Sequence, residues 1–204
     1  TAIRELCLTD PDEAARTVTD FSAYLRENMA SLTSSRPIPF ERELRHARTY
    51  LSLEQRRFGE RLCVEFDVAT TAFRLPPLSL QALVENAVRH GVAKCERGGC
   101  VRIVVREEPD AFTVAVQDDG VGFDVERKSD DERLRVGIAN VRTRMEALMG
   151  GSLLVESVPG AGTCATLRVP KKPRMGRWEP GCSEKEAVFA EAERPTEQRA
   201  KGSR

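Results

Sequence analysis

Apolar side chains recur at steps of three and four residues near the start of the chain, which is the period of an amphipathic helix. The apolar stripe of this first helix comprises Ala14, Val18, Phe21, Leu25, Met29 and Leu32. Just before it, Asp10 can cap the helix, Pro11 suits the first helical position and Glu13 can complete a capping box. We therefore expect a long helix whose stripe needs a second helix to cover it.

Two prolines, Pro37 and Pro39, interrupt this pattern, and a second helical pattern follows over residues 41–58. Its apolar side contains Leu44, Ala47, Leu51 and Phe58. Residues 1–58 are therefore predicted to form a helical hairpin. The stripe of its first helix predicts a homodimer held by a helical bundle, and the alternative is that the hairpin packs on the rest of its own chain.

Beyond Gly59 the period changes to two, as in half-buried strands. Alternation predicts strands over residues 62–68, 101–106, 112–117, 153–157 and 163–169. Helical patterns run from Pro76 to Gly91 and from Ile138 to Met149. The predicted fold class is α+β, with the helical hairpin followed by an α/β sandwich that has a mixed, mainly antiparallel sheet over residues 59–170.

Composition and charge limit the function classes. No run approaches the roughly 18 apolar residues of a membrane span, and no secretion signal is visible. The 32 basic residues balance 32 acidic ones, which argues against nucleic acid as a partner. The composition of residues 171–204 predicts a disordered tail. The chain opens at Thr1 without methionine, so we expect a piece of a longer protein with no membrane contact of its own.

The six cysteines contain no C-x-x-C pair, and the two closest, Cys95 and Cys100, have no histidine at ligand spacing. We expect reduced thiols, with zinc binding or disulfides as the alternative.

Three segments carry candidate chemistry. Asn86 and His90 are four residues apart and share a helix face, where an amide oxygen could ligate Mg²⁺ and Arg89 or His90 could meet phosphate. Asp118 ends a strand before a glycine-rich bend and could accept a hydrogen bond from an exocyclic amine. Gly137 at a helix start could approach phosphate, as could the turn before Thr163. Taken alone, the Asn86 and Asp118 segments are more often a structural helix end and a turn than a binding site, and a lone glycine turn proves little.

Together and in this order, the segments resemble the Bergerat ATP-binding fold of gyrase, mismatch-repair and histidine-kinase ATPases. The closest resemblance is to the LytS-type sensor histidine kinases, carried by LPPLSLQALVENAVRHG, DDGVGFD, VGIANVRTRMEALMGG and ESVPGAGTCATLRVP.

The resemblance implies a set of functional residues. It implies Asn86 as the Mg²⁺ ligand, with Arg89 and His90 beside it as catalytic residues. It implies that Asp118 reads the adenine amino group. The full set of implied cofactor-binding residues is Glu85, Asn86, His90, Asp118, Gly120, Gly122, Gly137, Gly162 and Thr163. Residues 124–135 would form a mobile lid over ATP.

The resemblance also implies a function. The chain would be the catalytic portion of a two-component sensor kinase that binds ATP and Mg²⁺, phosphorylates a histidine and relays the phosphoryl group to an aspartate of a response regulator. Residues 1–58 would then be the dimerisation and phosphotransfer region. The whole chain would lie in the cytoplasm, with a membrane-attached sensor region elsewhere in the full protein.

This sequence departs from the family at two points. The phosphoacceptor histidine of the family would lie before Thr1, and neither of the two histidines present is expected to replace it. We expect His46 to be solvated on its helix and His90 to belong to the ATP site. At the end of the lid, Arg135 stands where a second glycine is common, and only Gly137 remains.

Two other functions remain open. Anti-sigma-type serine kinases share the fold but place a glutamate base four residues before the metal-binding asparagine, where this chain has Ala82. The second open function is that of a nucleotide-binding or dimerising module without transfer chemistry.

Overall fold

The computed structural model describes residues 2–32, 36–124 and 132–172. The predicted disordered tail beyond residue 172 and most of the predicted lid lie outside these residues. The N-terminal helices are α1 (Ala2–Thr9) and α2 (Pro11–Leu32), followed by α3 (Phe40–Phe58). The start signal of α2 is confirmed, because the Glu13 amide donates a 3.0 Å hydrogen bond to Oδ1 of Asp10.

Helix α2 packs against α3 through a different face from the predicted apolar stripe. Ala14, Thr17 and Tyr24 are buried, Arg56 of α3 donates to the Thr17 hydroxyl, and the Tyr24 ring lies 5.9 Å from that of Tyr50. The predicted stripe is largely uncovered in this chain. Its exposed members are Val18 (46%), Phe21 (44%), Leu25 (45%) and Met29 (70%).

Helix α3 packs into the main hydrophobic core. The predicted residues Leu44, Ala47 and Leu51 are buried there with residues of the sheet and of the helix that follows. The expectation that His46 is solvated is wrong, because its side chain is 1% exposed. The buried arc of α3 is wider than its apolar residues indicate, and it includes Glu43 as well.

The main sheet has five strands in the order β2-β4-β5-β7-β6. These are β2 (Leu62–Val68), β4 (Gly99–Glu107), β5 (Ala111–Asp118), β6 (Ser152–Val158) and β7 (Gly162–Pro170). The β2–β4 pair is parallel and the other pairs are antiparallel, so the predicted mixed, mainly antiparallel sheet is confirmed. Sequence analysis missed the two-residue pair of β1 (Ile38–Pro39) and β3 (Arg74–Leu75).

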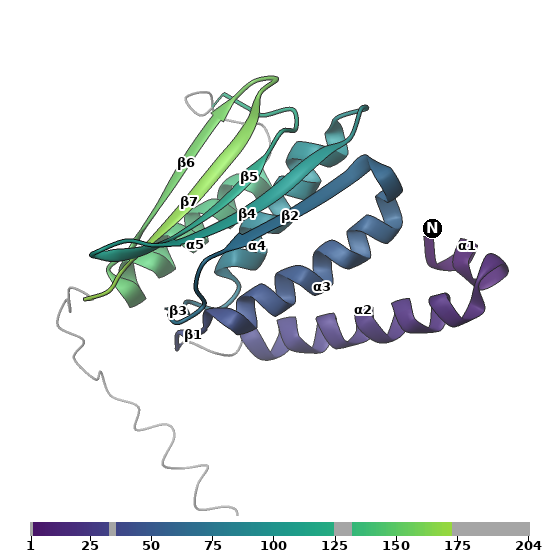
Figure 1. Cartoon of the computed structure of the whole chain (residues 1–204), viewed down its shortest axis with the longest axis horizontal. Helices are drawn as coiled ribbons and strands as arrows, with labels where there is room; N and C mark the ends of the chain where they lie inside the picture. Colours follow the sequence, from purple (N-terminus) through teal and green to yellow (C-terminus); the bar gives the residue numbers. More distant parts are fainter. Residues whose placement is uncertain (1, 33–35, 125–131, 173–204) are drawn as a thin grey trace, which may run out of the picture. The chain divides into compact units, whose positions relative to one another are not determined.

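Three helices cover one face of the sheet, namely α3, α4 (Ser79–Asn86) and α5 (Glu132–Met149) (Figure 1). Helix α4 continues into a π-helical turn, η2 (Ala87–Gly91), and short helical turns form η1 (Gly59–Arg61) and η3 (Val92–Lys94). Side chains that alternate along the strands meet these helices, for example Val101, Ile103 and Val105 of β4, all fully buried. Among the described helices, none combines the length and apolarity needed to cross a bilayer.

Candidate functional site

A small pocket, partly open to solvent, lies between the π-helical turn η2, the start of α5 and the adjacent ends of β5 and β7. Its polar lining comes from the predicted residues Asn86, His90, Asp118 and Thr163. The rest of the lining is glycine and apolar, comprising Gly91, Leu83, Ala87, Val116, Phe123, Ile138, Val155 and Ala165. The fold thus brings together residues that lie up to 82 positions apart in the sequence, from Leu83 to Ala165.

Asp118 provides the one carboxylate of this lining. Its side chain is 9% exposed, and its Oδ1 accepts a 3.0 Å hydrogen bond from the Gly120 amide. Burial raises the pKa of Asp118 to about 6, and the charge of Asp119 adds to the rise. A poorly solvated carboxylate with remaining acceptor capacity is therefore presented to whatever enters the pocket.

Glycines let the backbone segments around Asp118 approach one another. A Cβ at Gly91 would lie 2.3 Å from Oδ1 of Asp118, and one at Gly120 would lie 2.2 Å from the Gly91 backbone. Gly162 has φ +95°, and a Cβ there would lie 1.9 Å from the Asp118 carbonyl oxygen. These glycines therefore fix the position of the carboxylate, and Gly91 was not on the predicted list of site residues.

A hydroxyl pair anchors the strand beside the pocket. Ser157 Oγ accepts a hydrogen bond from the Phe123 amide and donates one to the Gly162 carbonyl, at 2.9 and 3.0 Å. It also lies 3.0 Å from the hydroxyl of Thr163. These contacts join the chain after Gly122 to the β6–β7 turn. Ser157 and Phe123 were not on the predicted list of site residues, although both lie within motifs that carry the family resemblance.

Asn86 and Gly137 face each other at the junction of α4 and α5. A Cβ at Gly137 would lie 3.7 Å from Nδ2 and 4.0 Å from Oδ1 of Asn86, so the helix backbone passes close to this side chain. The buried Nδ2 of Asn86 has no hydrogen-bond partner among the described residues. An unpartnered buried amide beside a glycine on α5 fits a site that holds a polar ligand with its cation.

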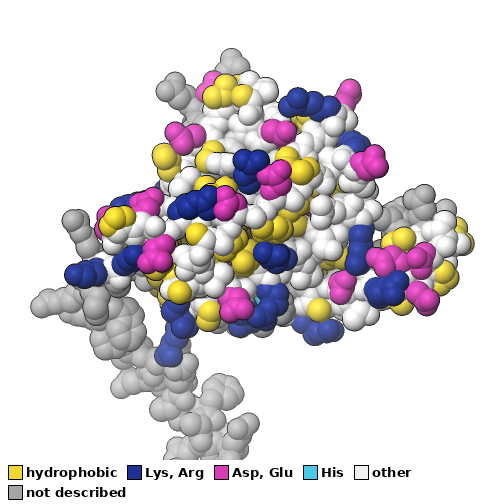
Figure 2. Space-filling model, in the orientation of Figure 1, with side chains coloured by type: hydrophobic (Ala, Val, Ile, Leu, Met, Phe, Trp, Pro, Cys, Tyr) yellow, Lys and Arg dark blue, Asp and Glu magenta, His cyan; other side chains and the backbone are white. Residues whose placement is uncertain are grey.

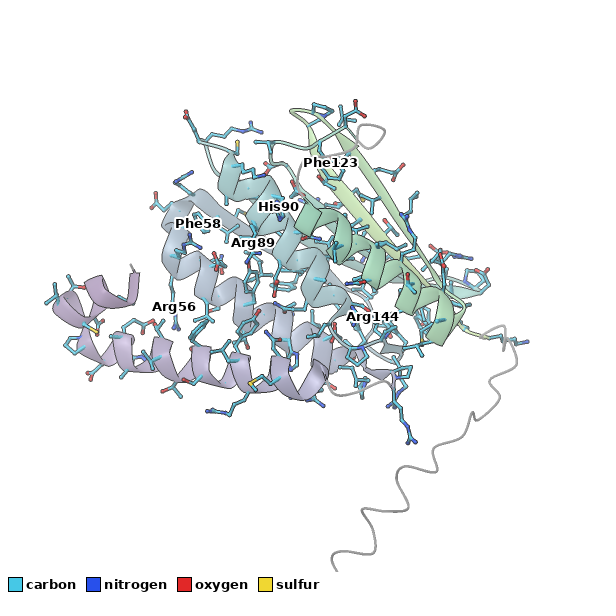
Figure 3. The ribbon with its side chains drawn as sticks, turned by 180° about the vertical axis from the view of Figure 1, so that it is seen from behind. Arg56, Phe58, Arg89, His90, Phe123 and Arg144 are labelled. Atoms are coloured by element: carbon cyan, nitrogen blue, oxygen red, sulfur yellow. The ribbon has the colours of Figure 1, made fainter. Side chains whose placement is uncertain are left out.

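Six predicted site residues are not among those that line the pocket, namely the four glycines Gly120, Gly122, Gly137 and Gly162 and the charged residues Glu85 and Arg89. Arg89 is exposed and lies between η2 and α3 (Figure 3), where its charge acts on Tyr50. Glu85 instead accepts hydrogen bonds from Tyr24 of α2 and from Gln81, at 2.7 and 2.8 Å. Glu85 and Arg89 each precede a residue of the face that Asn86 and His90 share. Helix geometry turns the side chains of Glu85 and Arg89 away from that face, toward the N-terminal helices.

A buried carboxylate holds the N-terminus of α4. Glu43 of α3 is fully buried and accepts hydrogen bonds from the amides of Leu78 and Leu80, at 2.8 and 3.0 Å. Burial raises the pKa of Glu43, although these amides and the charge of Arg144 oppose the rise. Arg144 of α5 in turn donates to the Pro77 carbonyl. This cap positions the helix that carries Asn86, and no sequence signal revealed it.

Comparisons with known proteins agree with this geometry. The family model described as histidine kinase-, DNA gyrase B- and HSP90-like ATPase matches residues 78–173, and the histidine kinase model matches residues 1–62. The uncharacterised protein YwpD of Bacillus subtilis (strain 168) is 37% identical over 164 residues, 77% of this chain and 59% of that protein. The sensor protein LytS of Enterococcus faecalis is 31% identical over 180 residues, 82% of this chain and 30% of that protein.

The catalytic domain of the histidine kinase ThkA, a solved structure, has the same fold. It superposes with a TM-score of 0.52 at 17% identity, covering 67% of this chain and 95% of the domain. The chain spans 59% and 30% of the lengths of the two curated relatives. The motifs, the fold and the matches agree, and the chain belongs to the histidine kinase family.

Proposed function

We propose that this chain binds Mg²⁺-ATP in the pocket at Asp118 and transfers the γ-phosphoryl group to a histidine, from which an aspartate of a response regulator receives it. The observation that carries the proposal is the buried Asp118 carboxylate in a pocket whose walls are mainly apolar. Apolar walls such as Val116 and Ile138 suit a flat heteroaromatic base. The carboxylate suits its exocyclic amine, since an ionised acceptor forms the stronger hydrogen bond.

The phosphate end of the nucleotide belongs on the other side of the pocket. Asn86 would hold Mg²⁺ through its amide oxygen, and His90 would contact phosphate oxygens. Thr163 is the partner of Asp118 in the β5–β7 register and therefore belongs to the base end of the site. When bound, Mg²⁺ neutralises charge on the phosphates. Gly137 leaves the backbone of α5 open to close approach. Phosphoryl transfer depends mainly on positioning and charge neutralisation, so this side of the site needs no protein nucleophile.

The acceptor histidine must come from outside these 204 residues. The chain has two histidines. His46 is 1% exposed inside the core, and His90 lines the nucleotide pocket. Neither can meet the γ-phosphate of ATP bound in the pocket while also being open to a response regulator. The acceptor is therefore proposed on another part of the longer protein.

Helix α2 supports the proposal of a homodimer. Val18, Phe21, Leu25 and Met29 recur at helical spacing and are 44–70% exposed, on a face that α3 does not cover. A row of exposed apolar side chains along one helix is suited to pairing with the same helix of a second copy.

Transfer is tested with radiolabelled ATP on a version of the protein that includes the segment upstream of Thr1. We expect acid-labile labelling that is abolished in Asn86→Ala and retained in Gln117→Ala, which removes an exposed carboxamide on β5. Acid-stable labelling would indicate a serine kinase instead. ATP binding with no labelling at all would indicate a nucleotide-binding module without transfer chemistry.

A further inference from the structure

The face of the sheet opposite the helices carries a cluster that the nucleotide site does not use. Cys63 of β2 and Cys100 of β4 are partners in the parallel register, and their Sγ atoms are 2.7 Å apart. Glu65 is two residues beyond Cys63 and therefore on the same face. One ligand atom from each of the three residues lies within 4.8 Å of the other two. We propose that Cys63, Cys100 and Glu65 form a binding site for a thiophilic divalent cation such as Zn²⁺.

The donor set suits this class of ion. Zn²⁺ accepts thiolate sulfur at about 2.3 Å and carboxylate oxygen at about 2.0–2.2 Å, which puts neighbouring ligand atoms of a tetrahedral site about 3–4 Å apart. Small rotations of the two cysteine side chains bring their sulfur atoms from the present 2.7 Å to that separation. Cys63 is exposed, so the fourth position is open to water.

Charge at the site balances once a cation binds. Two thiolates and a carboxylate bring three negative charges, of which a divalent cation neutralises two. Arg102 of β4 lies 2.6 Å from Oε2 of Glu65 and can neutralise the third while orienting the carboxylate. Thiolate is the ligating form, so cation binding at neutral pH releases a proton from each thiol that it ligates.

Rigid strands hold the donors in place. The Cys100 amide donates a 2.6 Å hydrogen bond to Oδ1 of Asp119, and the Asp119 amide donates to the Cys100 carbonyl at 3.3 Å. The open face around the cluster carries basic and acidic side chains (Figure 2), and ion pairs of Arg102 with Glu65 and of Arg106 with Asp67 join β4 to β2. The site therefore needs little rearrangement beyond the two thiols.

A disulfide between Cys63 and Cys100 is the competing use of the pair. It would use the two thiols alone, although the carboxylate of Glu65 has an oxygen within 4.8 Å of both sulfur atoms. The presence of this third donor favours a cation site over a disulfide.

The proposal is tested on the reduced full chain by titration with Co²⁺ alone, followed in the ultraviolet and visible, and with Zn²⁺ alone in competition with a chromophoric chelator. We expect one high-affinity site with a sulfur-to-cobalt charge-transfer band. The band should disappear in Cys63→Ser and in Cys100→Ser. Glu65→Gln should weaken Zn²⁺ binding about tenfold or more. Cys164→Ser, which removes another partly exposed cysteine of the sheet, is the matched control and should bind as the wild type does.

Thermal unfolding provides a second readout that does not depend on kinase activity or ATP. Zn²⁺ should raise the melting temperature of the wild type and of Cys164→Ser but not of Cys63→Ser. Loss of the band in Cys164→Ser, or its persistence in Cys63→Ser, would overturn the proposal. So would the absence of Zn²⁺ binding together with a loss of two hydrogens in the intact mass on exposure to glutathione disulfide, which would identify a redox pair.

Discussion

The hydroxyl of Tyr24 donates a 2.7 Å hydrogen bond to the carboxylate of Glu85, the residue that precedes Asn86. Gln81 donates to both groups, at 2.9 Å to the Tyr24 oxygen and 2.8 Å to the Glu85 carboxylate. The Tyr24–Glu85 hydrogen bond joins helix α2 to α4, the helix that carries the proposed Mg²⁺ ligand Asn86. Burial raises the pKa of Tyr24, and Glu85 raises it further, so the hydroxyl remains a donor at neutral pH.

Removing this hydroxyl should cost stability without removing the nucleotide site. Tyr24→Phe keeps the ring but loses a hydrogen bond to a charged acceptor, so we expect the free energy of unfolding to fall by about 1–2 kcal/mol. A double-mutant cycle with Glu85→Gln in urea denaturation measures the coupling, which we expect to be well above zero. Strictly additive effects would show that the bond does not contribute. ATP affinity should change little, because neither side chain lines the pocket.

Asp118 should make the chain less stable as pH rises. Its folded-state pKa of about 6 lies above its ordinary value of 3.8, so the folded state holds the proton more tightly than the unfolded state. Stability is then fully retained below about pH 4 and is lost as pH rises toward 6. Asp118→Asn should therefore be more stable than the wild type at pH 7 by about 1–3 kcal/mol.

Urea denaturation at the two ends of this range checks the sign. The stability difference should shrink toward zero below about pH 3, where Asp118 is protonated in both the folded and the unfolded state. Asp12→Asn is the control, because it makes the same chemical change at an exposed carboxylate on α2. A gain in Asp118→Asn that does not vary with pH would mean that burial of the charge is not its cause.

Removing the buried carboxylate of Glu43 should greatly lower the free energy of unfolding, because this carboxylate caps the N-terminus of α4. Glu43→Ala leaves the amides of Leu78 and Leu80 buried without acceptors and opens a cavity, and we expect a loss of about 3 kcal/mol or more. Glu43→Gln keeps one acceptor oxygen and should lose less. Glu60→Ala, at an exposed position, should stay within about 0.5 kcal/mol of the wild type. Equal losses in Glu43→Ala and Glu60→Ala would refute the capping role.

The exposed stripe of α2 should control self-association. Each Phe or Leu side chain that a dimer buries contributes roughly 1.5–3 kcal/mol, in both copies. We expect light scattering to show a dimer at micromolar concentration for the wild type and a monomer for Phe21→Asp and Leu25→Asp. Leu154→Asp changes an equally exposed apolar residue of β6 and should leave the dimer intact. A monomeric wild type would contradict pairing through these residues alone.

Local signals predicted much of this structure. The strands from Leu62 and from residue 101 onward were recognisable because one face of the sheet is buried, which imposes a period of two. The cap by Asp10 was recognisable because the bond spans three residues. Asn86, His90, Asp118 and Thr163 do meet in one pocket. Their individual roles remain predictions.

Contacts between distant residues could not be predicted. The bond from Leu78 to Glu43 spans 35 positions, and that from Tyr24 to Glu85 spans 61. A polar residue on a helix gives no sign that a partner will bury it, which is also why His46 was wrongly expected to be solvated. The stripe of α2 was seen correctly as apolar, but only the structure shows that α3 packs on the adjacent face, against Tyr24.

Calorimetric titration of ATP, with and without Mg²⁺, into the wild type, Asp118→Asn and Asp119→Asn is the most direct test of the proposed nucleotide site. The proposal predicts Mg²⁺-dependent binding by the wild type and by Asp119→Asn, and loss of binding in Asp118→Asn even though that variant is the more stable protein at pH 7. Unchanged affinity in Asp118→Asn, or no binding by the wild type, would contradict it.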